Sequence, residues 1–465
     1  MTHSLSRRTI LAGGAAALLA PMARFDVFAA EDGFTELVAK PAKIQLVGPD
    51  GPTSDLWGYN GSVPGPILRA KVGDTLRIRF RNELTQPTSI HWHGIRIDNA
   101  MDGVSHLTQE PVQPGEMFEY EFEVPDAGTY WYHAHNKSWE EVARGLYGAL
   151  IVDEPEPLVP EGADITLVLD DWRLDKQGRF DAASLGQMMD WSHGGRLGNF
   201  ITVNGEQKPS VPVPMGHWLR LRLINAANAR IMEIDPNRFG AEIIAYDGQP
   251  IGEAQRLNYT PFLLGPAQRV DLLVKFDQLG EVLLEEISGK PYIFATLDVR
   301  ESGVLANEKP TLPPAALPTP DLNNALEFDL LMEGGAMGQM GQLIYNGRVQ
   351  TRADFMSNKQ VWGFNGVANI AQEPFFAVQK GQSVVLNVTN RTRFPHAMHT
   401  HGHHFKIIER NGSNDIEQLW RDTFIIGPNG TTRIAFVADN PGKWLFHCHM
   451  LEHAAAGMST WFKVT

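Results

Sequence analysis

Near the C-terminus, residues 443–458 read KWLFHCHMLEHAAAGM. Cys448 is the only cysteine of the chain, so it cannot close an intramolecular disulfide. An isolated cysteine commonly packs as a small apolar side chain. Here an imidazole follows at His453 and a thioether at Met458, and with the thiolate they make a soft ligand set that suits copper. One cysteine, two histidines and a weak axial methionine form a blue-copper electron-transfer site, so this stretch predicts one, with its second histidine supplied from elsewhere.

The alternation of residue types within this stretch carries a second inference. Lys443 to Phe446 favour a β-strand, in which successive side chains point to opposite faces of the sheet. His447 and His449 would then face one way and Cys448 the other. One strand could therefore serve two metal sites, with a short covalent path for an electron between them.

Histidines recur at the same spacing elsewhere in the chain. With 16 histidines in 465 residues, chance would produce roughly half of one His-x-His pair. Besides the pair at 447 and 449, three such pairs occur: His91 and His93, His133 and His135, and His399 and His401. Together they supply more imidazoles than a single metal ion needs. The segment 396–403 also offers several candidates for the second histidine of the blue-copper site.

These four segments, in this order, resemble the four copper-binding signatures of the multicopper oxidases, the family of laccases, bilirubin oxidases and bacterial copper-efflux oxidases. The resemblance covers the chain beyond its N-terminal segment. It implies an enzyme with four copper ions, one of type 1, one of type 2 and a type 3 pair. Such an enzyme takes single electrons from a small reducing substrate and uses four of them to reduce dioxygen to water.

The resemblance also assigns roles to the residues at matching positions. It implies a type 1 copper held by His396, Cys448 and His453, with Met458 as the axial ligand. It implies a type 2 copper held by His91 and His399. The type 3 pair would be held by the other six imidazoles, which are His93, His133, His135, His401, His447 and His449.

Two positions depart from the family pattern. Ala397 stands where proline usually follows the first histidine of the third signature, which alters local stiffness more than ligation. Ala454 stands where many bacterial members carry a glutamate that helps to deliver protons to oxygen. Asp102 matches the other acid of that relay and could act alone with bound water. The alternative is a turn residue, because Asp-Gly at 102–103 is a turn signal.

Short apolar runs that alternate with polar residues, separated by Gly, Pro and Asp turns, predict an all-β protein. The length suits about three domains, and the resemblance implies three cupredoxin-like Greek-key β-sandwiches. We place these domains at residues 31–155, 160–305 and 322–465, with a Pro-rich, semi-rigid linker before the third.

The second predicted domain contains only two histidines, His193 and His217, and neither matches a ligand motif. We therefore expect this domain to act as a spacer. Because neither outer domain has enough His-x-His pairs on its own, the copper cluster must form between the first and the third.

The N-terminus reads as a targeting signal. Residues 1–30 resemble a twin-arginine signal peptide, with Arg7 and Arg8 ahead of an apolar stretch that is too short to span a bilayer and a small-residue cleavage site at Ala29. We expect an exported, periplasmic protein without a membrane span. The formal charge of −14 argues against nucleic acid or anionic lipid as a partner, and we expect a monomer.

The reducing substrate stays open at this point, because electron transfer at an exposed edge of His396 would tolerate phenols, aromatic amines, Cu(I) and Fe(II) alike. Met332, Met337 and Met340 lie among glycines, which would keep the segment exposed, and thioethers select Cu(I). Met188 and Met189 could add a second soft patch. The chain is then either a laccase-like enzyme or a cuprous oxidase for periplasmic copper tolerance, unless these methionines only fill gaps.

Non-enzymatic readings are also open. Some relatives of the family have lost their ligands and serve in cell division, and a copper-storage role is conceivable. Every ligand position of the four signatures is filled here, which argues against a relative without copper.

Overall fold

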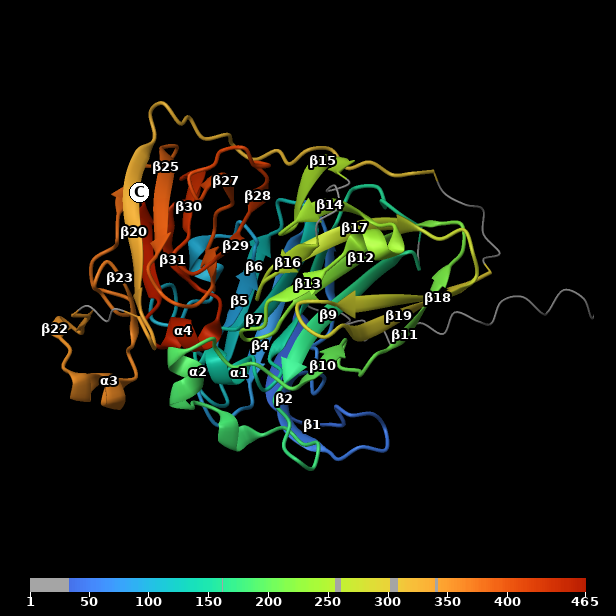
Figure 1. The fold of residues 1–465 in the computed structure, drawn as a ribbon, viewed down its shortest axis with the longest axis horizontal. Coiled ribbons are helices and arrows are strands. Elements are labelled where there is room, and N and C mark those ends of the chain that lie inside the picture. Colours follow the sequence, from blue (N-terminus) through green and yellow to red (C-terminus); the bar gives the residue numbers. More distant parts are fainter. Residues whose placement is uncertain (1–32, 161, 256–260, 302–307, 339–341) are drawn as a thin grey trace, which may run out of the picture.

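The computed structural model describes residues 33–465 apart from 161, 256–260, 302–307 and 339–341. The expected signal peptide and Met340 lie outside the described residues. Within the described part, no helix combines the length and the apolar character needed to cross a membrane. Three successive groups of strands, which we call the first, second and third blocks, lie side by side (Figure 1).

The first block consists of two four-stranded sheets, ordered β2-β1-β4-β6 and β3-β8-β7-β5. In β6, exposed glutamates alternate with buried Tyr120 and Phe122, so one face of the strand packs on the core. The strands are β1 (Thr35–Ile44), β2 (Ser54–Tyr59), β3 (Leu68–Lys71), β4 (Thr75–Asn82), β5 (Ile90–His93), β6 (Met117–Glu123), β7 (Gly128–Ala134) and β8 (Tyr147–Asp153).

The second block holds a six-stranded sheet, β10-β9-β12-β17-β14-β15, a three-stranded sheet, β11-β19-β18, and the pair β13-β16. In β12 the alternating residues Arg220 and Arg222 are buried beside carboxylates. The strands are β9 (Asp164–Trp172), β10 (Phe200–Val203), β11 (Ser210–Pro214), β12 (Trp218–Asn225), β13 (Met232–Ile234), β14 (Glu242–Tyr246), β15 (Gln249–Gln255), β16 (Phe262–Leu264), β17 (Arg269–Lys275), β18 (Gly280–Glu286) and β19 (Tyr292–Arg300).

The third block holds a six-stranded sheet, β23-β20-β25-β30-β27-β28, a five-stranded sheet, β24-β32-β31-β26-β29, and the hairpin β21-β22. The strands are β20 (Leu326–Gly334), β21 (Ile344–Tyr345), β22 (Arg348–Val349), β23 (Trp362–Phe364), β24 (Ala377–Val378), β25 (Ser383–Asn390), β26 (His396–Thr400), β27 (Phe405–Arg410), β28 (Trp420–Arg421), β29 (Thr423–Ile426), β30 (Thr431–Val437), β31 (Gly442–Cys448) and β32 (Ser459–Val464).

Helices are few and short. They are η1 (Asn99–Met101), α1 (Ser138–Glu141), η2 (Ala182–Ser184), α2 (Met188–Ser192), η3 (Pro236–Phe239), α3 (Arg352–Asn358) and α4 (Leu451–Ala455). The helices α1, α2 and α4 come from the first, second and third blocks and meet at one edge of the molecule (Figure 1). Along the chain, α4 follows shortly after the histidine-rich end of β31.

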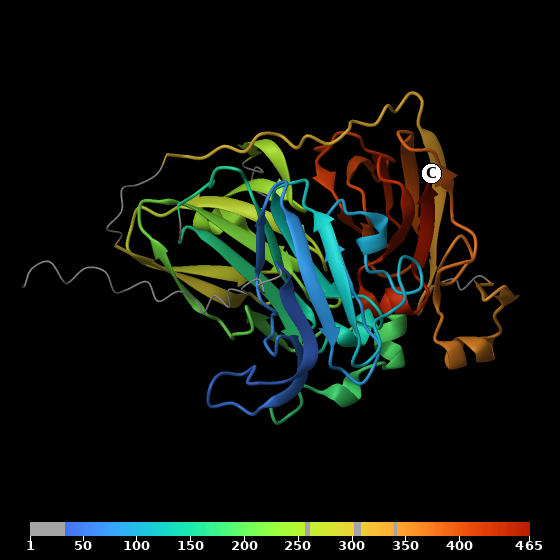
Figure 2. The same cartoon turned by 180° about the vertical axis from the view of Figure 1, so that it is seen from behind.

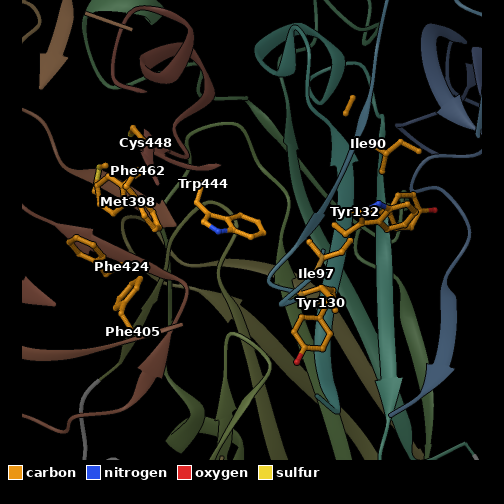
Figure 3. Close-up of a cluster of buried hydrophobic side chains, with 14 of the residues drawn as sticks. Ile90, Ile97, Tyr130, Tyr132, Met398, Phe405, Phe424, Trp444, Cys448 and Phe462 are labelled. Atoms are coloured by element: carbon orange, nitrogen blue, oxygen red, sulfur yellow. The ribbon is translucent and has the colours of Figure 1, made fainter. Parts of the chain in front are cut away.

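The first and third blocks share one apolar core. A single cluster of buried side chains includes Ile90 and Tyr132 of the first block and Met398, Phe424 and Trp444 of the third. Figure 3 shows the two groups of side chains facing each other, with Trp444 between them. Figure 2 shows the same three blocks from behind, with the second block beside the other two. The predicted all-β class is therefore confirmed, whereas the exact domain boundaries stay a prediction.

One expectation about the methionine segment is wrong. Met332 lies on β20 with no exposed surface and packs in the core, because the strand alternation turns this side chain inward. Met337, beyond the end of β20, is 73% exposed. The segment is thus packed at its beginning and exposed only after the strand has ended.

Candidate metal centre

Strand pairing brings the four His-x-His pairs together. In the first block β5 pairs with β7, which places His91 opposite His133. In the third block β26 pairs with β31, which places His399 opposite His447 and Met398 opposite Cys448. All eight imidazoles are buried except that of His135, which is half-buried. The histidines therefore converge at the interface between these two blocks.

Six of these rings form two sets of three, each drawn from both blocks. In one set the ring centroids of His93, His133 and His449 lie 5.0 to 5.7 Å apart. In the other, the candidate ligand atoms of His135, His401 and His447 lie within 4.8 Å of one another. The remaining pair, His91 and His399, has centroids 5.8 Å apart and contacts both sets.

Hydrogen bonds identify which ring nitrogen of His91 and of His399 is free. The Nδ1 atoms of His91 and His399 lie 2.8 and 2.9 Å from the carbonyl oxygens of Asp102 and Asp422. A carbonyl only accepts, so each ring carries its proton on Nδ1. Their Nε2 lone pairs are buried and have no hydrogen-bond partner in the part of the chain that the structure describes. A buried polar atom without a partner calls for an explanation, and a bound cation provides one.

The same reasoning applies to His401 and His447, which belong to one of the two sets of three. His401 donates from Nδ1 to the carboxylate of Asp102 at 3.0 Å, and His447 donates from Nδ1 to the carbonyl of Cys448 at 2.9 Å. Burial holds the pKa of both rings well below the ordinary value, so both are neutral. Their Nε2 atoms lie 3.1 Å apart. Two lone pairs at that distance repel each other unless a cation lies beside them, and neutral imidazoles suit copper.

A separate set lies on the other side of β31. Cys448 Sγ is 3.6 Å from His396 Nδ1 and 3.9 Å from His453 Nδ1, and these two nitrogens are 3.1 Å apart. Met458 is fully buried next to this set, and its carbonyl accepts the backbone N–H of Cys448 at 3.0 Å. The prediction that His447 and Cys448 point to opposite sides of one strand is confirmed.

Hydrogen-bond partners also show which ring nitrogen carries the proton in His453 and in His396. His453 donates from Nε2 to the carbonyl of His193 at 2.6 Å, and His396 Nε2 lies 2.8 Å from the hydroxyl of Thr392. That hydroxyl donates to a backbone carbonyl, so His396 must be the donor to it and its Nδ1 is free. Burial raises the pKa of Cys448 to about 12. The thiol is therefore protonated without metal, and copper must displace that proton to bind.

Two expectations about this set are wrong. His396 has no exposed surface, so it offers no exposed edge to a reductant. The second block is also more than a spacer, because the carbonyl of its residue His193 orients His453. Sequence reasoning missed this contact because a backbone carbonyl carries no residue-type signal.

Asp102 lies against two of these histidines, His91 and His401. Its carboxylate has no exposed surface and lies 3.0 Å from His401 Nδ1 and 3.3 Å from His91 Nδ1. It also follows the 3-10 helix η1 directly and precedes Gly103, which has a φ of 81°. Asp102 is thus a turn residue and also a buried acid in contact with two imidazoles. The turn role and the acid role expected from the sequence are therefore compatible.

A second buried acid, Asp422, escaped sequence reasoning. Its Oδ1 lies 3.4 Å from His93 Nε2, and its carbonyl orients His399. Arg269, from β17 of the second block, donates to both carboxylate oxygens at 2.9 and 2.6 Å and to the carbonyl of Thr129 at 3.1 Å. Although burial favours the neutral acid, the guanidinium holds the pKa of Asp422 well below its ordinary range.

Three further histidines of the described residues lie outside these sets. His403 and His404 are buried behind the site, where His403 Nδ1 lies 3.3 Å from the carbonyl of His401 and His404 Nε2 lies 3.7 Å from Asp422. His106 is exposed beside Glu110. None of these three residues is among the predicted ligands, which agrees with this geometry.

The comparisons with known proteins all match this chain to proteins of the same family. Two family models, both described as multicopper oxidase, match residues 42–157 and 345–465. The chain is 30% identical to multicopper oxidase MmcO of Mycobacterium tuberculosis, over 97% of its own length and 91% of that protein. It is 27% identical to laccase-1 of Botryotinia fuckeliana, over 89% and 79%.

Solved structures of proteins described in the same way have a similar fold. The multi-copper oxidase of Pseudomonas thermotolerans superposes with a TM-score of 0.81 at 34% identity, over 92% of this chain and 98% of the other. A multicopper oxidase of Campylobacter jejuni, described as a metallo-oxidase, superposes with a TM-score of 0.76 at 27% identity, over 93% and 91%. The expectation of three cupredoxin-like sandwiches is confirmed by this likeness.

The ion pair of Arg269 generates a prediction about metal binding. We expect Arg269→Met to weaken copper binding by about 10–100-fold, because Asp422 would lose the partner that keeps it oriented toward His93 and His399. Copper content per chain after dialysis against a graded chelator measures this. Arg220→Met is the matched control, since it removes an equally buried ion pair whose partners Asp271 and Glu154 make no hydrogen bond to the candidate ligands.

Both variants should unfold at lower temperature, since breaking a buried ion pair costs about 3–5 kcal/mol. Only Arg269→Met should lose copper more readily. Equal copper retention in the two variants would show that the ion pair serves stability alone.

Proposed function

Because the chain belongs to the multicopper oxidases, we propose that it binds four copper ions, one of type 1, one of type 2 and a type 3 pair, and oxidises small reducing substrates in a laccase-like reaction. Copper supplies the one-electron redox chemistry that couples these oxidations to the four-electron reduction of dioxygen to water. Phenols, aromatic amines and low-valent metal ions are the candidate substrates.

The proposed ligands follow the sets described above. Cys448, His396 and His453 would hold the type 1 copper with Met458 axial, and His91 and His399 would hold the type 2 copper. The type 3 pair would be held by His93, His133 and His449 on one side and by His135, His401 and His447 on the other. The observation that carries this proposal is the convergence of buried imidazole nitrogens, some of which face each other at 3.1 and 3.3 Å while others have no hydrogen-bond partner among the described residues.

Strand β31 provides the electron path in this proposal. Cys448 would receive the electron at the type 1 site, and its direct neighbours His447 and His449 belong to the two sets of three. The carbonyl of Cys448 also accepts the Nδ1 proton of His447 at 2.9 Å. Both the covalent chain and this hydrogen bond therefore join the two sites.

The loss of the thiolate tests this function. Cys448→Ser should abolish the intense blue absorption and the oxygen consumption, because a hydroxyl is a hard and poor substitute for a thiolate. Copper content should fall by one ion per chain, and the melting temperature of the apoprotein should change little. His106→Ala, an exposed histidine outside the sets, is the control and should behave as wild type. A variant that keeps its strong visible absorption would contradict the proposal.

We further propose that Asp102 assists proton delivery to oxygen. Ala454 leaves no carboxylate at the other family position, whereas Asp102 is buried between His91 and His401. The carboxylate fixes the proton of His401 on Nδ1 and lies at the cluster where oxygen would react.

Replacement of this acid separates the two half-reactions. Asp102→Asn should slow reoxidation of the reduced enzyme by oxygen by about 10²–10⁴-fold, since an amide cannot transfer protons as an acid does. Reduction of the type 1 site, followed in the absence of oxygen by loss of blue absorption, should remain close to the wild-type rate. Equal effects on both half-reactions, or no effect on either, would count against the role.

A cuprous oxidase that supports copper tolerance is the second candidate function. Met189 on α2 and Met337 are 64% and 73% exposed. The two segments are joined where the backbone N–H of Ala336 donates to the carbonyl of Ser192 at 2.7 Å. Soft thioethers are thus exposed on two joined segments next to His193, the residue that orients His453, and such ligands select Cu(I).

Paired methionine variants distinguish the two functions. Met189→Ser combined with Met337→Ser should raise the Michaelis constant for Cu(I) and leave that for a methoxyphenol unchanged if the thioethers collect Cu(I). Met117→Ser, at a methionine that is 59% exposed on β6, is the matched control. If both substrates respond alike, or neither responds, a general laccase is the better description.

We also propose export to the periplasm by the twin-arginine route, on the strength of Arg7 and Arg8 ahead of a short apolar stretch. The protein would act there as a monomer. Oxygen turnover would separate this enzyme from a copper-storage protein or a cell-division relative.

A further inference from the structure

The imidazoles of the proposed type 1 site are closed off from solvent. His396 and His453 have no exposed surface, and His396 Nε2 is used by Thr392. The indole ring of Trp362 packs against both imidazoles, with centroid distances of 5.1 and 4.5 Å. A reductant in solution therefore cannot touch either ring, and its electron must pass through a covering residue.

His193 is the covering residue with the most direct connection. Its carbonyl accepts the Nε2 proton of His453 at 2.6 Å, so one hydrogen bond joins the two residues. Its side chain is half-buried, whereas the described histidines other than His106 and His135 are buried. His193 therefore reaches from the surface to the type 1 ligand.

The hydrogen bonds of His193 leave one nitrogen of its half-buried ring available as an acceptor. The hydroxyl of Ser192 donates to the carbonyl of Met188 at 2.8 Å, so it can only accept from His193 Nδ1, which lies 2.9 Å away. In this tautomer the ring carries a lone pair on Nε2, which makes no hydrogen bond within the described residues. Phe394 packs edge-to-face with this imidazole at 5.6 Å and adds an aromatic wall.

The segment that carries His193 is held firmly against the third block. Trp362 donates from Nε1 to the carbonyl of Trp191 at 2.6 Å. On the other side, the buried carboxylate of Glu452 accepts the backbone N–H of Arg196 at 3.3 Å and the side-chain amide of Asn228 at 2.8 Å. The contact between His193 and His453 thus belongs to a packed joint between two blocks.

We propose that His193 is the residue at which a phenol or an aromatic amine docks and through which its electron enters the protein. This inference rests on the type 1 site proposed above. The substrate O–H or N–H donates to His193 Nε2 while its ring packs on Phe394. The substrate loses one electron through the His193 peptide to His453 and the type 1 site, which is reduced by one electron, and releases its proton to water.

Variants at position 193 test the proposal on the copper-loaded enzyme. His193→Phe keeps an aromatic ring and the backbone carbonyl but removes the Nε2 acceptor. It should raise the Michaelis constant for a methoxyphenol about tenfold, the effect of one lost hydrogen bond. The constant for hexacyanoferrate(II), an anion without an O–H or N–H group, should rise far less. His106→Phe, at an exposed histidine that does not contact the type 1 set, is the matched control for both substrates.

The absorption spectrum and reduction potential of the type 1 site provide the readout that does not depend on turnover. Both should be unchanged in His193→Phe, because the carbonyl that orients His453 is retained. An unchanged constant for the methoxyphenol, an equal rise for both reductants, or a shifted type 1 spectrum would each overturn the docking role. Failure of the wild-type chain to develop blue absorption or consume oxygen after copper loading would instead refute the proposed function itself.

Discussion

The ion pair between Arg269 and Asp422 is the contact on which the candidate centre depends most. It joins a strand of the second block to the third block, and the same guanidinium reaches the carbonyl of Thr129 in the first. Asp422 in turn lies against His93 and His399, which come from different blocks. A buried carboxylate is costly unless it is paired, so the arginine is what allows an ionised acid to orient imidazoles there.

The imidazoles themselves impose a constraint that protein contacts alone do not satisfy. Backbone carbonyls and Asp102 take up one nitrogen of several rings, and the other nitrogens then converge as unpaired lone pairs. Burial lowers the pKa of His399, His401 and His447, which keeps these three rings neutral. Packing of the fold therefore holds the ligand nitrogens in place before the metal binds. Preorganisation of this kind lets copper bind without a large rearrangement of the ligands.

The second block contributes no imidazole or thiolate to any of the sets, yet it shapes both sites. Arg269 supports the histidine cluster, and the carbonyl of His193 orients His453 by accepting its Nε2 proton. The helices α1, α2 and α4 meet at that point, one from each block. A domain that looks like a spacer in the sequence thus controls how a ligand histidine is held and how it can be reached.

The sequence by itself determined the all-β class, the candidate ligands and the two-sided use of His447 and Cys448. These features are local: a period of two along a strand and a fixed spacing between donors are visible in a single segment. Only the tertiary structure revealed Arg269, Asp422 and the His193 carbonyl, and it placed Met332 in the core and His396 away from solvent. The contacts of Arg269 with Asp422, of Asp422 with His93 and of His193 with His453 join segments more than a hundred residues apart, so they depend on how the blocks pack rather than on any local pattern.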